Sequence, residues 1–210
     1  MPPEPAGRGA TSSPGAAPAG RVFCLTGAPD AGKTQVCLRV AEVAKYRGLR
    51  VSGLVTESRR LTSGRIVQTV LNLRTGERRR LADYVGVDEG EPIGSGVAGR
   101  FSWTFVRESV RWGRHELDRC LSRDSDLLVI DQIGPLELLA CSGWSNAVDV
   151  LASARFGLAL VVVNPLVAAR LRMLLAGADL SEAEVRPAAL EPLTQRLVDL
   201  ALEHRLADRA

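Results

Sequence analysis

A short segment near the start of the chain has the residue types and spacing of a phosphate-binding loop. It consists of Gly27, Ala28, Pro29, Asp30, Ala31, Gly32, Lys33 and Thr34, followed by Gln35, and it fits the pattern G-x-x-x-x-G-K-[ST]. The glycines let the backbone wrap so that its N–H groups point at phosphate oxygens, aided by the positive end of the following helix. We expect Lys33 to bridge the β- and γ-phosphates and the Thr34 hydroxyl to bind Mg²⁺. The motif therefore predicts a site for a nucleoside triphosphate such as ATP or GTP.

A second candidate is Asp131, which follows the apolar run at residues 127–130. A P-loop needs a second acid for its magnesium shell, usually at the end of a buried strand beside the first strand. Ligands of open α/β sheets bind at the carboxyl ends of the strands. We therefore expect Asp131 to complete a magnesium site with Thr34; the alternative is that it caps a helix or a turn.

The segments around these residues alternate between short apolar runs and helical stretches. This pattern predicts an α/β fold, with a mostly parallel sheet flanked by helices on both faces. The expected strands are 22–26, 51–56, 127–130 and 158–163, and the expected helices are 33–46, 104–121 and 190–206. Two β-like stretches, 66–73 and 78–81, flank a glycine-containing turn at 74–77 and predict a β-hairpin insertion. The phosphate-binding motif thus lies between a strand and a helix, as it requires.

Length and composition indicate one domain. The chain has 210 residues, of which 46% are hydrophobic, enough for one sizeable core. Residues 1–20 are rich in Pro, Gly and Ala, so we expect a disordered tail before a nucleotide-binding domain at 21–210. Neither a membrane-length apolar run nor an apolar signal core is present in the sequence. These features predict a cytoplasmic protein that does not associate with membranes.

The charge balance does not indicate nucleic-acid binding. The chain has 27 basic and 24 acidic residues, a net charge of +3. The basic run Arg78-Arg79-Arg80 lacks interleaved aromatic residues, and we interpret it as a solvated strand edge that blocks aggregation. The cysteines are Cys24, Cys37, Cys120 and Cys141. Their wide spacing predicts reduced, mostly buried thiols instead of a zinc site or disulfides.

Three segments together carry a family resemblance. They are the P-loop, Thr56-Glu57-Ser58-Arg59 with a weaker Gly64-Arg65, and Asp131-Gln132-Ile133-Gly134-Pro135-Leu136-Glu137. Over about residues 22–185 the chain resembles small nucleoside-triphosphatases first described in thermophiles, which have a human relative called cancer-related nucleoside-triphosphatase. The resemblance implies a RecA-like P-loop fold and slow, Mg²⁺-dependent hydrolysis of several nucleoside triphosphates to the diphosphate and phosphate.

One position departs from the family pattern. Where the family has Glu directly after the magnesium-linked acid, this chain has Gln132, which cannot accept a proton as a carboxylate does. If that position supplies the base, hydrolysis is slow or absent; if Gln132 only orients water, as glutamine does in some GTPases, turnover persists. The chain is thus either a triphosphatase or a nucleotide-dependent switch or partner protein with little turnover.

Further candidates surround the phosphate site. Glu137 is a candidate for polarising water or supporting the site, against a surface or helix-capping role. Arg59, which matches the family position, and Arg65 are candidates for stabilising charge on the γ-phosphoryl group, against a solvated position near the hairpin. The candidate catalytic residues are therefore Lys33, Asp131, Gln132, Glu137 and Arg59.

Two groups of residues are candidates for contacting the base. The aromatic residues are Phe101, Trp103, Phe105 and Trp112, for which core packing is the favoured interpretation. Asn164-Pro165 follows a strand, and a turn is favoured there. A third function, a small-molecule or nucleotide kinase, also stays open, because a P-loop serves phosphoryl transfer to acceptors other than water. That function needs an acceptor pocket, which the sequence does not reveal.

Overall fold

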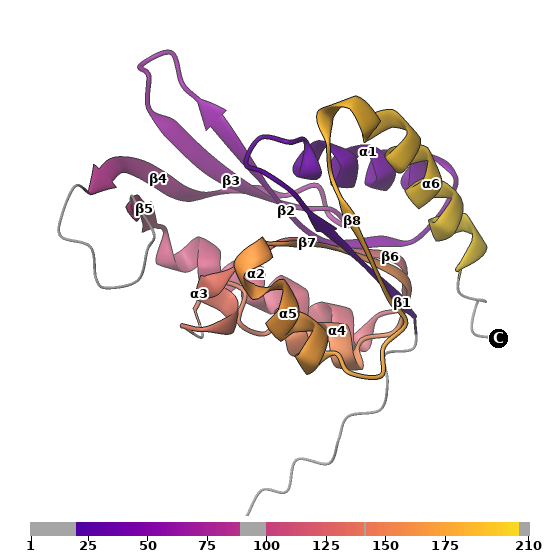
Figure 1. The fold of residues 1–210 in the computed structure, drawn as a ribbon. Coiled ribbons are helices and arrows are strands. Elements are labelled where there is room, and N and C mark those ends of the chain that lie inside the picture. Colours follow the sequence, from indigo (N-terminus) through magenta and orange to yellow (C-terminus); the bar gives the residue numbers. More distant parts are fainter. Residues whose placement is uncertain (1–19, 89–99, 141, 206–210) are drawn as a thin grey trace, which may run out of the picture.

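The computed structural model describes residues 20–88, 100–140 and 142–205, which form one sheet covered by helices (Figure 1). In these residues the sheet has eight strands in the order β5-β4-β3-β2-β6-β7-β1-β8. The strands are β1 (Arg21–Thr26), β2 (Val51–Arg60), β3 (Ile66–Asn72), β4 (Arg78–Asp88), β5 (Arg100–Phe105), β6 (Ser125–Ile133), β7 (Phe156–Val163) and β8 (Leu180–Glu184).

The sheet has a parallel part and an antiparallel part. Strands β2, β6, β7, β1 and β8 pair in parallel, whereas β3, β4 and β5 extend the sheet beyond β2 by antiparallel pairing. Every residue of β7 is buried, as expected of a parallel strand covered on both faces. The mostly parallel sheet and its β-insertion are therefore confirmed, and the insertion is larger than predicted because β4 continues to Asp88 and pairs with β5.

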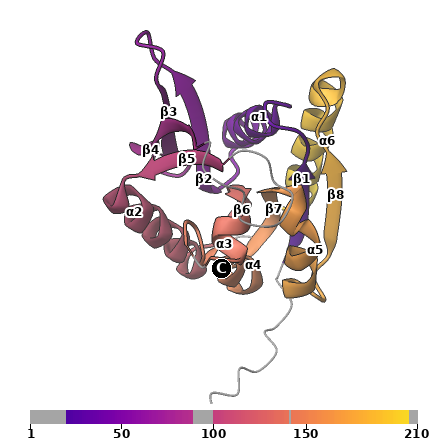
Figure 2. The same cartoon turned by 60° about the vertical axis from the view of Figure 1, so that its left-hand side comes forward.

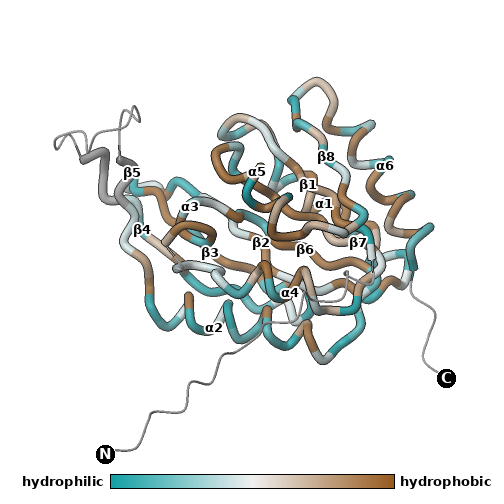
Figure 3. Tube along the Cα trace, turned by 60° about the horizontal axis from the view of Figure 1, so that its bottom comes forward, coloured by the Kyte–Doolittle hydropathy of each residue, from teal (hydrophilic) through white to brown (hydrophobic). Residues whose placement is uncertain are grey.

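Helices cover both faces of the sheet. They are α1 (Lys33–Tyr46), α2 (Arg107–Asp118), α3 (Pro135–Leu138), α4 (Ala147–Ser153), α5 (Pro165–Leu174) and α6 (Leu190–Glu203), with short 3-10 helices at Arg119–Ser122 and Pro187–Ala189. Helices α1 and α6 lie on one face and α2 to α5 on the other (Figures 1 and 2). Hydrophobic residues are concentrated along the central strands between these layers (Figure 3). No helix of the described residues is both long and apolar enough to cross a bilayer.

The helix predicted at 104–121 is partly wrong. Thr104 and Phe105 belong to β5, and α2 begins only at Arg107. The backbone N–H of Val106 donates to Leu81 O at 2.8 Å, so pairing with the β-insertion overrides the helical spacing of the apolar residues. The predicted loop at 90–99 lies outside the described residues.

The arginine-rich segment lies on an edge of the sheet, as predicted. Arg78, Arg79 and Arg80 on β4 pair with β3 on one side only, because the pairing of β4 with β5 begins at Ala82. Each guanidinium has an acidic partner: Arg78 pairs with Glu57, Arg79 with Glu77 at 2.7 Å, and Arg80 with Asp83. Such pairing leaves little free positive charge for an anionic polymer.

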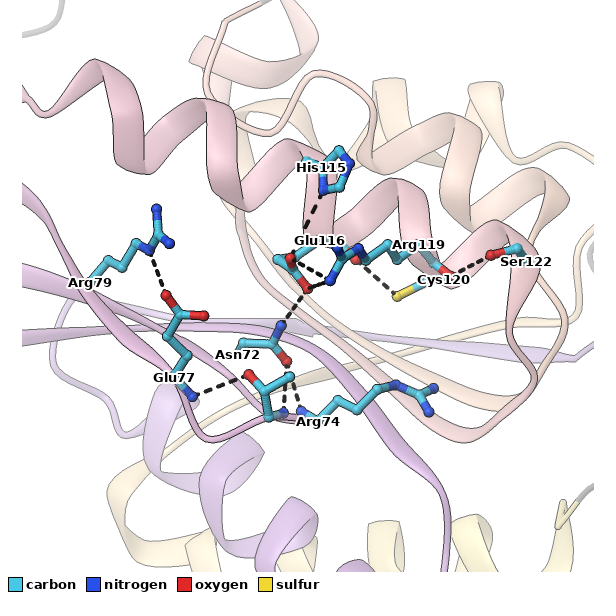
Figure 4. Close-up of polar contacts among 10 residues, drawn as sticks. Asn72, Arg74, Glu77, Arg79, His115, Glu116, Arg119, Cys120 and Ser122 are labelled. Carbon is cyan, nitrogen blue, oxygen red and sulfur yellow. Dashed lines mark hydrogen bonds and ion pairs between the residues drawn. The ribbon is translucent and has the colours of Figure 1, made fainter.

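The turn between β3 and β4 is anchored by Asn72. Its Oδ1 accepts the N–H groups of Arg74 and Thr75 at 2.8 and 3.2 Å, and its Nδ2 donates to Glu116 Oε2 at 2.8 Å (Figure 4). Glu116 lies on α2 and also pairs with Arg119 at 3.1 Å. This network fixes the insertion against α2 at the end of the sheet opposite the carboxyl ends of the parallel strands.

The burial expected of the cysteines is confirmed for those that the structure describes. Cys24, Cys37 and Cys120 are free and buried. Burial raises the pKa of Cys24 to about 12 and that of Cys120 to about 11, so both thiols are protonated at neutral pH. Cys141 lies outside the described residues.

Close packing between β2 and β6 generates the first prediction. Gly53 has φ +110°, and a Cβ atom there would lie 1.8 Å from Val129 O. We expect Gly53→Ala to lower the free energy of unfolding by at least about 4 kcal/mol in urea denaturation. The control is Gly48→Ala, at φ +77° with nothing within 4 Å of the new atom, which should cost about 1 kcal/mol. Equal losses for the two variants would contradict the packing described here.

Candidate functional site

The phosphate-binding motif forms the turn between β1 and α1. Its backbone enters the left-handed region at Gly27 (φ 137°), Asp30 (φ 58°) and Gly32 (φ 96°). At Gly27 a Cβ atom would lie 2.8 Å from Val185 O, so both the conformation and the packing require glycine. Helix α1 has no side-chain cap and no acid in its first turn, which leaves its first N–H groups available to an anion.

Lys33 lies over this turn. Its ammonium donates to Gly27 O at 2.8 Å and to Ala28 O at 2.5 Å, both within the loop. The positive charge is therefore held at the mouth of the loop, where the motif predicts it. A phosphate oxygen entering the loop can replace these carbonyl contacts with a stronger charge-assisted bond.

Asp131 joins the motif to the middle of the sheet. Its side chain is 2% exposed, and Oδ2 accepts hydrogen bonds from Thr34 Oγ1 at 2.9 Å and from the Thr56 backbone N–H at 3.1 Å. The predicted proximity of Thr34 and Asp131 is therefore present. The expected strand order was wrong in one respect, because β7 lies between β1 and β6.

Burial makes the Asp131 carboxylate costly to ionise. It raises the pKa of Asp131 to about 6, and Glu57 acts in the same direction. The bonds from Thr56 and Thr34 and the charge of Lys33 oppose this rise without cancelling it. A cation beside the carboxylate would stabilise its charged form.

The residues present fit a magnesium ion. Thr34 and Asp131 offer a hydroxyl and a carboxylate oxygen at one point, and Mg²⁺ prefers oxygen ligands. Over the part of the chain that the structure describes, no group of three or more His, Cys, Asp or Glu could hold a metal by itself. This small protein contribution suits an ion that also takes phosphate and water oxygens.

Gln132 occupies a distortion of β6 that the sequence did not reveal. The pairing of β6 with β7 shifts register between Ile130 and Ile133, and Gln132 has φ +81°. Left-handed backbone at a residue other than glycine is uncommon, and bulges often redirect side chains at functional sites. Asp131 is consequently buried, whereas Gln132 is exposed at the carboxyl edge of the sheet.

Glu137 is held by backbone groups close to Gln132. Oε2 accepts the N–H of Gly134 at 2.8 Å, in a capping box at the start of α3, and Oε1 accepts the N–H of Trp144 at 3.3 Å. Burial raises the pKa of Glu137, while these bonds oppose the rise. The carboxylate therefore caps α3 and also ties the segment after that helix to its start.

The two candidate arginines lie near the tip of the β2–β3 hairpin, which projects past the rest of the sheet (Figures 1 and 2). Arg59 is on β2, and Arg65 is in the connection just before β3. Arg59 follows Glu57 on the same face of β2, and its exposed side chain makes no hydrogen bond or ion pair with another described residue. Arg65 Nη2 pairs with Asp83 Oδ1 at 3.0 Å. Only Arg59 therefore keeps an unengaged guanidinium near the carboxyl end of β2.

The predicted aromatic group does not form one cluster. Trp103 lies edge-on to Tyr84 with ring centroids 5.3 Å apart, and Arg79 lies over the ring of Trp112 at 4.7 Å. Phe105, by contrast, lines a cavity beside Gln132, and the side chain of Phe101 lies outside the described part. Trp103 and Trp112 are partly buried and pack against the core, as favoured.

Asn164 follows β7 at the same edge of the sheet. Its Oδ1 accepts the N–H of Leu166 at 3.0 Å and so caps α5. Asn164 also lines the cavity beside Gln132. In place of the expected turn, Asn164 caps a helix that begins at Pro165 and that the sequence did not predict. A polar residue at the end of a strand was the signal that could have placed Asn164 at the cavity.

Known proteins with similar sequences indicate one family. The model of a family described as NTPase matches residues 22–182. A nucleoside-triphosphatase THEP1 of Thermofilum pendens is 33% identical over 161 residues, covering 77% of this chain and 84% of the relative. A THEP1 of Caldivirga maquilingensis is 32% identical over 132 residues, covering 63% and 69%.

Two solved structures share the fold. A human cancer-related nucleoside triphosphatase aligns with a TM-score of 0.57 and 24% identity, covering 84% of this chain and 97% of that one. THEP1 from Aquifex aeolicus aligns with a TM-score of 0.55 and 17% identity, covering 86% and 98%. At these identities the structures show a common P-loop NTPase architecture.

The buried acid generates a prediction about pH. Because the folded state raises the pKa of Asp131 above its ordinary value of 3.8 to about 6, its contribution to stability is present below about pH 4 and is lost as pH rises through 6. Asp131→Asn should therefore stabilise the ligand-free protein at pH 7 by on the order of 2–3 kcal/mol, with no gain at pH 4. Urea unfolding at both pH values checks this.

The control for that measurement is Asp199→Asn on α6, where the carboxylate is exposed and accepts from Gln195 at 2.9 Å. This change should stay within about 0.5 kcal/mol at either pH. An Asp131→Asn protein no more stable than the parent at pH 7 would show that the carboxylate is not strained by burial.

Proposed function

The chain belongs to the NTPase family, and from this premise we propose that it hydrolyses the γ-phosphate of ATP, GTP and other nucleoside triphosphates in a Mg²⁺-dependent reaction. The observation that carries the proposal is the bond of 2.9 Å between Thr34 and Asp131. It brings the hydroxyl of the phosphate loop and the acid of a distant strand to one point, as a magnesium-linked triphosphate requires. The products are the nucleoside diphosphate and phosphate.

Binding of the triphosphate falls to residues 27–35. The N–H groups of the loop and of the first turn of α1 surround the β- and γ-phosphates, and Lys33 moves its bonds from Gly27 O and Ala28 O to phosphate oxygens. Thr34 and Asp131 would hold Mg²⁺, which supplies charge neutralisation on the phosphates when it is bound. Positioning and electrostatic stabilisation then account for most of the catalysis.

The residues proposed to activate water are Gln132 and Glu137, at the carboxyl edge of the sheet. We assign Gln132 to orient the attacking water through its exposed amide, and Glu137 to polarise water or to support this edge through its bonds to Gly134 and Trp144. Arg59 has no acidic partner among the described residues, and we assign it to stabilise the charge that spreads over the γ-phosphoryl oxygens.

The proposal also covers the cellular location and the partners of the protein. The free, buried thiols of Cys24, Cys37 and Cys120 suit a reducing compartment, and we place the protein in the cytoplasm. The paired arginines of β4 argue against a nucleic-acid partner. The tail expected at residues 1–20 lies, except for Gly20, outside the described residues.

A second candidate function is supported by Gln132 itself. An amide at the position where the family has a carboxylate cannot take a proton from water, and the protein would then be a nucleotide-dependent switch with negligible turnover. Tight triphosphate binding without phosphate release would distinguish this function from hydrolysis.

The proposed function predicts phosphate release from ATP, GTP, CTP and UTP by the purified chain with Mg²⁺. Lys33→Ala should lower kcat/KM at least about 100-fold, because a charge facing the γ-phosphate in the transition state is lost. Lys45→Ala is the matched control, since Lys45 lies in the last turn of α1 and far from the loop, and it should leave the rate unchanged. A malachite-green assay measures the phosphate.

Gln132→Glu separates the two candidates in the same assay. If the parent releases phosphate and Lys33→Ala does not, hydrolysis stands. If the parent binds nucleotide without release and Gln132→Glu restores turnover, the switch replaces the enzyme.

A further inference from the structure

Large hydrophobic side chains are exposed on α3 and α5, on the face of the sheet opposite α1 (Figures 1 and 2). In the described part of the chain nine such residues are exposed, and five of them lie on these two helices or directly after α3. The five are Leu136, Leu139, Leu166, Met173 and Leu174. Leu139, Leu166 and Met173 are 62, 74 and 78% exposed. Single exposed apolar residues need no explanation, but a group of them marks an interaction site.

The exposed residues of the two helices lie on one surface. Helices α3 and α5 contact each other and follow the adjacent strands β6 and β7 at the carboxyl edge. A Cβ atom at Gly134, which precedes α3, would lie 3.9 Å from Cβ of Asn164, which precedes α5. Leu136 and Leu166 are each the second residue of their helix, so both are close to this contact. We call the whole group the α3–α5 surface, with the members Leu136, Leu139, Leu166, Ala169, Arg170 and Met173.

Helix α5 has more apolar surface than its own packing uses. Its inner residues Val167 and Leu171 are buried in the core. Four outer residues at positions i, i+3, i+4 and i+7 are exposed, namely Leu166, Ala169, Arg170 and Met173. Residues at this spacing lie on one side of a helix. The helix therefore presents a second apolar stripe to the outside, with an arginine at its middle.

The charge of Arg170 is not compensated within this surface. Its guanidinium makes no hydrogen bond or ion pair with another described residue. The other arginine of α5, Arg172, is paired with Glu182 at 2.9 Å. Helix α5 contains no acid, and Glu137, the acid of α3, accepts backbone N–H groups. The α3–α5 surface as defined above is therefore apolar with one uncompensated cation.

This composition indicates what covers the surface. Met and Arg are enriched in the cores of protein–protein interfaces, whereas Asp and Glu are depleted there. A guanidinium that is buried without a partner is costly. A protein that covers the stripe must therefore bring a carboxylate to Arg170 together with apolar side chains.

Two other occupants fit the surface less well. A second copy packed about a twofold axis at the middle of the stripe would face Arg170 with its own counterpart, which places like charges together. A membrane surface attracts clusters of several basic residues, whereas the α3–α5 surface has one. The observations thus favour a different protein.

We propose that the α3–α5 surface docks an amphipathic helix of a partner protein, whose apolar side chains pack along Leu166 and Met173 and whose carboxylate pairs with Arg170. Helices that bind in this way carry apolar residues at the same spacing of i, i+3, i+4 and i+7. The surface begins at the carboxyl edge of the sheet, which carries Gln132, so the partner binds next to the proposed triphosphate site. The inference goes beyond the proposed function and does not require hydrolysis.

The test measures the binding of two synthetic peptides to the full chain. Each has about 18 residues, long enough to form a helix, with leucine at i, i+3, i+4 and i+7. One peptide carries glutamate and the other lysine at the flanking positions, and fluorescence anisotropy of a label gives both dissociation constants. We expect saturable binding of the glutamate peptide, at least about tenfold tighter than that of the lysine peptide. Arg170→Glu should reverse this preference.

Variants of the exposed apolar residues test the site. Leu166→Gln and Met173→Gln should each weaken binding of the glutamate peptide at least about fivefold, because each removes apolar contact area. The matched control is Tyr46→Gln, 88% exposed at the end of α1 on the other face of the sheet, which should keep the affinity within about twofold. All these positions are exposed, so the variants keep the fold, which urea unfolding checks.

The outcomes decide among the occupants. Absence of saturable binding of the glutamate peptide overturns the proposal, as does equal affinity in Leu166→Gln and Tyr46→Gln. Sedimentation that shows dimers of the parent but not of Leu166→Gln assigns the surface to a second copy. Binding to phosphatidylglycerol vesicles that Leu166→Gln abolishes assigns it to a membrane. Either result overturns the partner helix, whereas a monomer that binds the glutamate peptide and not the vesicles supports it.

Discussion

The buried carboxylate of Asp131 is the interaction on which the site depends. One oxygen accepts from the Thr34 hydroxyl at the start of α1 and from the Thr56 backbone on β2, so a single side chain joins three elements that are far apart in sequence. Burial opposes ionisation of the carboxylate and raises its pKa to about 6. The fold thus buries a carboxylate whose charged form is unfavourable until a cation binds beside it. Binding sites commonly lose some stability in this way for the sake of function.

The arrangement of the strands follows from this requirement. Strands β1 and β6 present the phosphate loop and the acid at the same edge, with β7 between them, and both faces of these strands are covered by helices. The bulge after Asp131 then separates two neighbouring residues: the acid points into the protein and Gln132 faces the edge. The residues that we propose for the metal and for the water are therefore adjacent positions of one strand.

The sequence predicts the parts of the site that depend on local pattern. The motif at residues 27–34 and the helix at Lys33–Tyr46 could be read from glycines, one lysine and helical spacing, and the structure has the helix at the predicted bounds. The bulge at Gln132 could not, because it depends on pairing with β7 about thirty residues later. Strand β8 could not be predicted either, because Leu180–Glu184 has no apolar pattern and is held mainly by pairing with β1. The cavity beside Gln132 could not be predicted either, because its lining residues come from β2, β3, β4, β5, α2, β6 and α3.

The most direct test of this account is the carboxyl ¹³C NMR titration of Asp131 in the full chain labelled at aspartate, with Asp131→Asn used to assign the signal. Without ligand, the account predicts a midpoint near pH 6, because burial leaves the charge poorly compensated. With Mg²⁺ and a non-hydrolysable GTP analogue together, the midpoint should fall below about pH 4. A midpoint near 4 in the ligand-free protein, or one that does not move when both ligands are added, would contradict the role of Asp131 at the magnesium site.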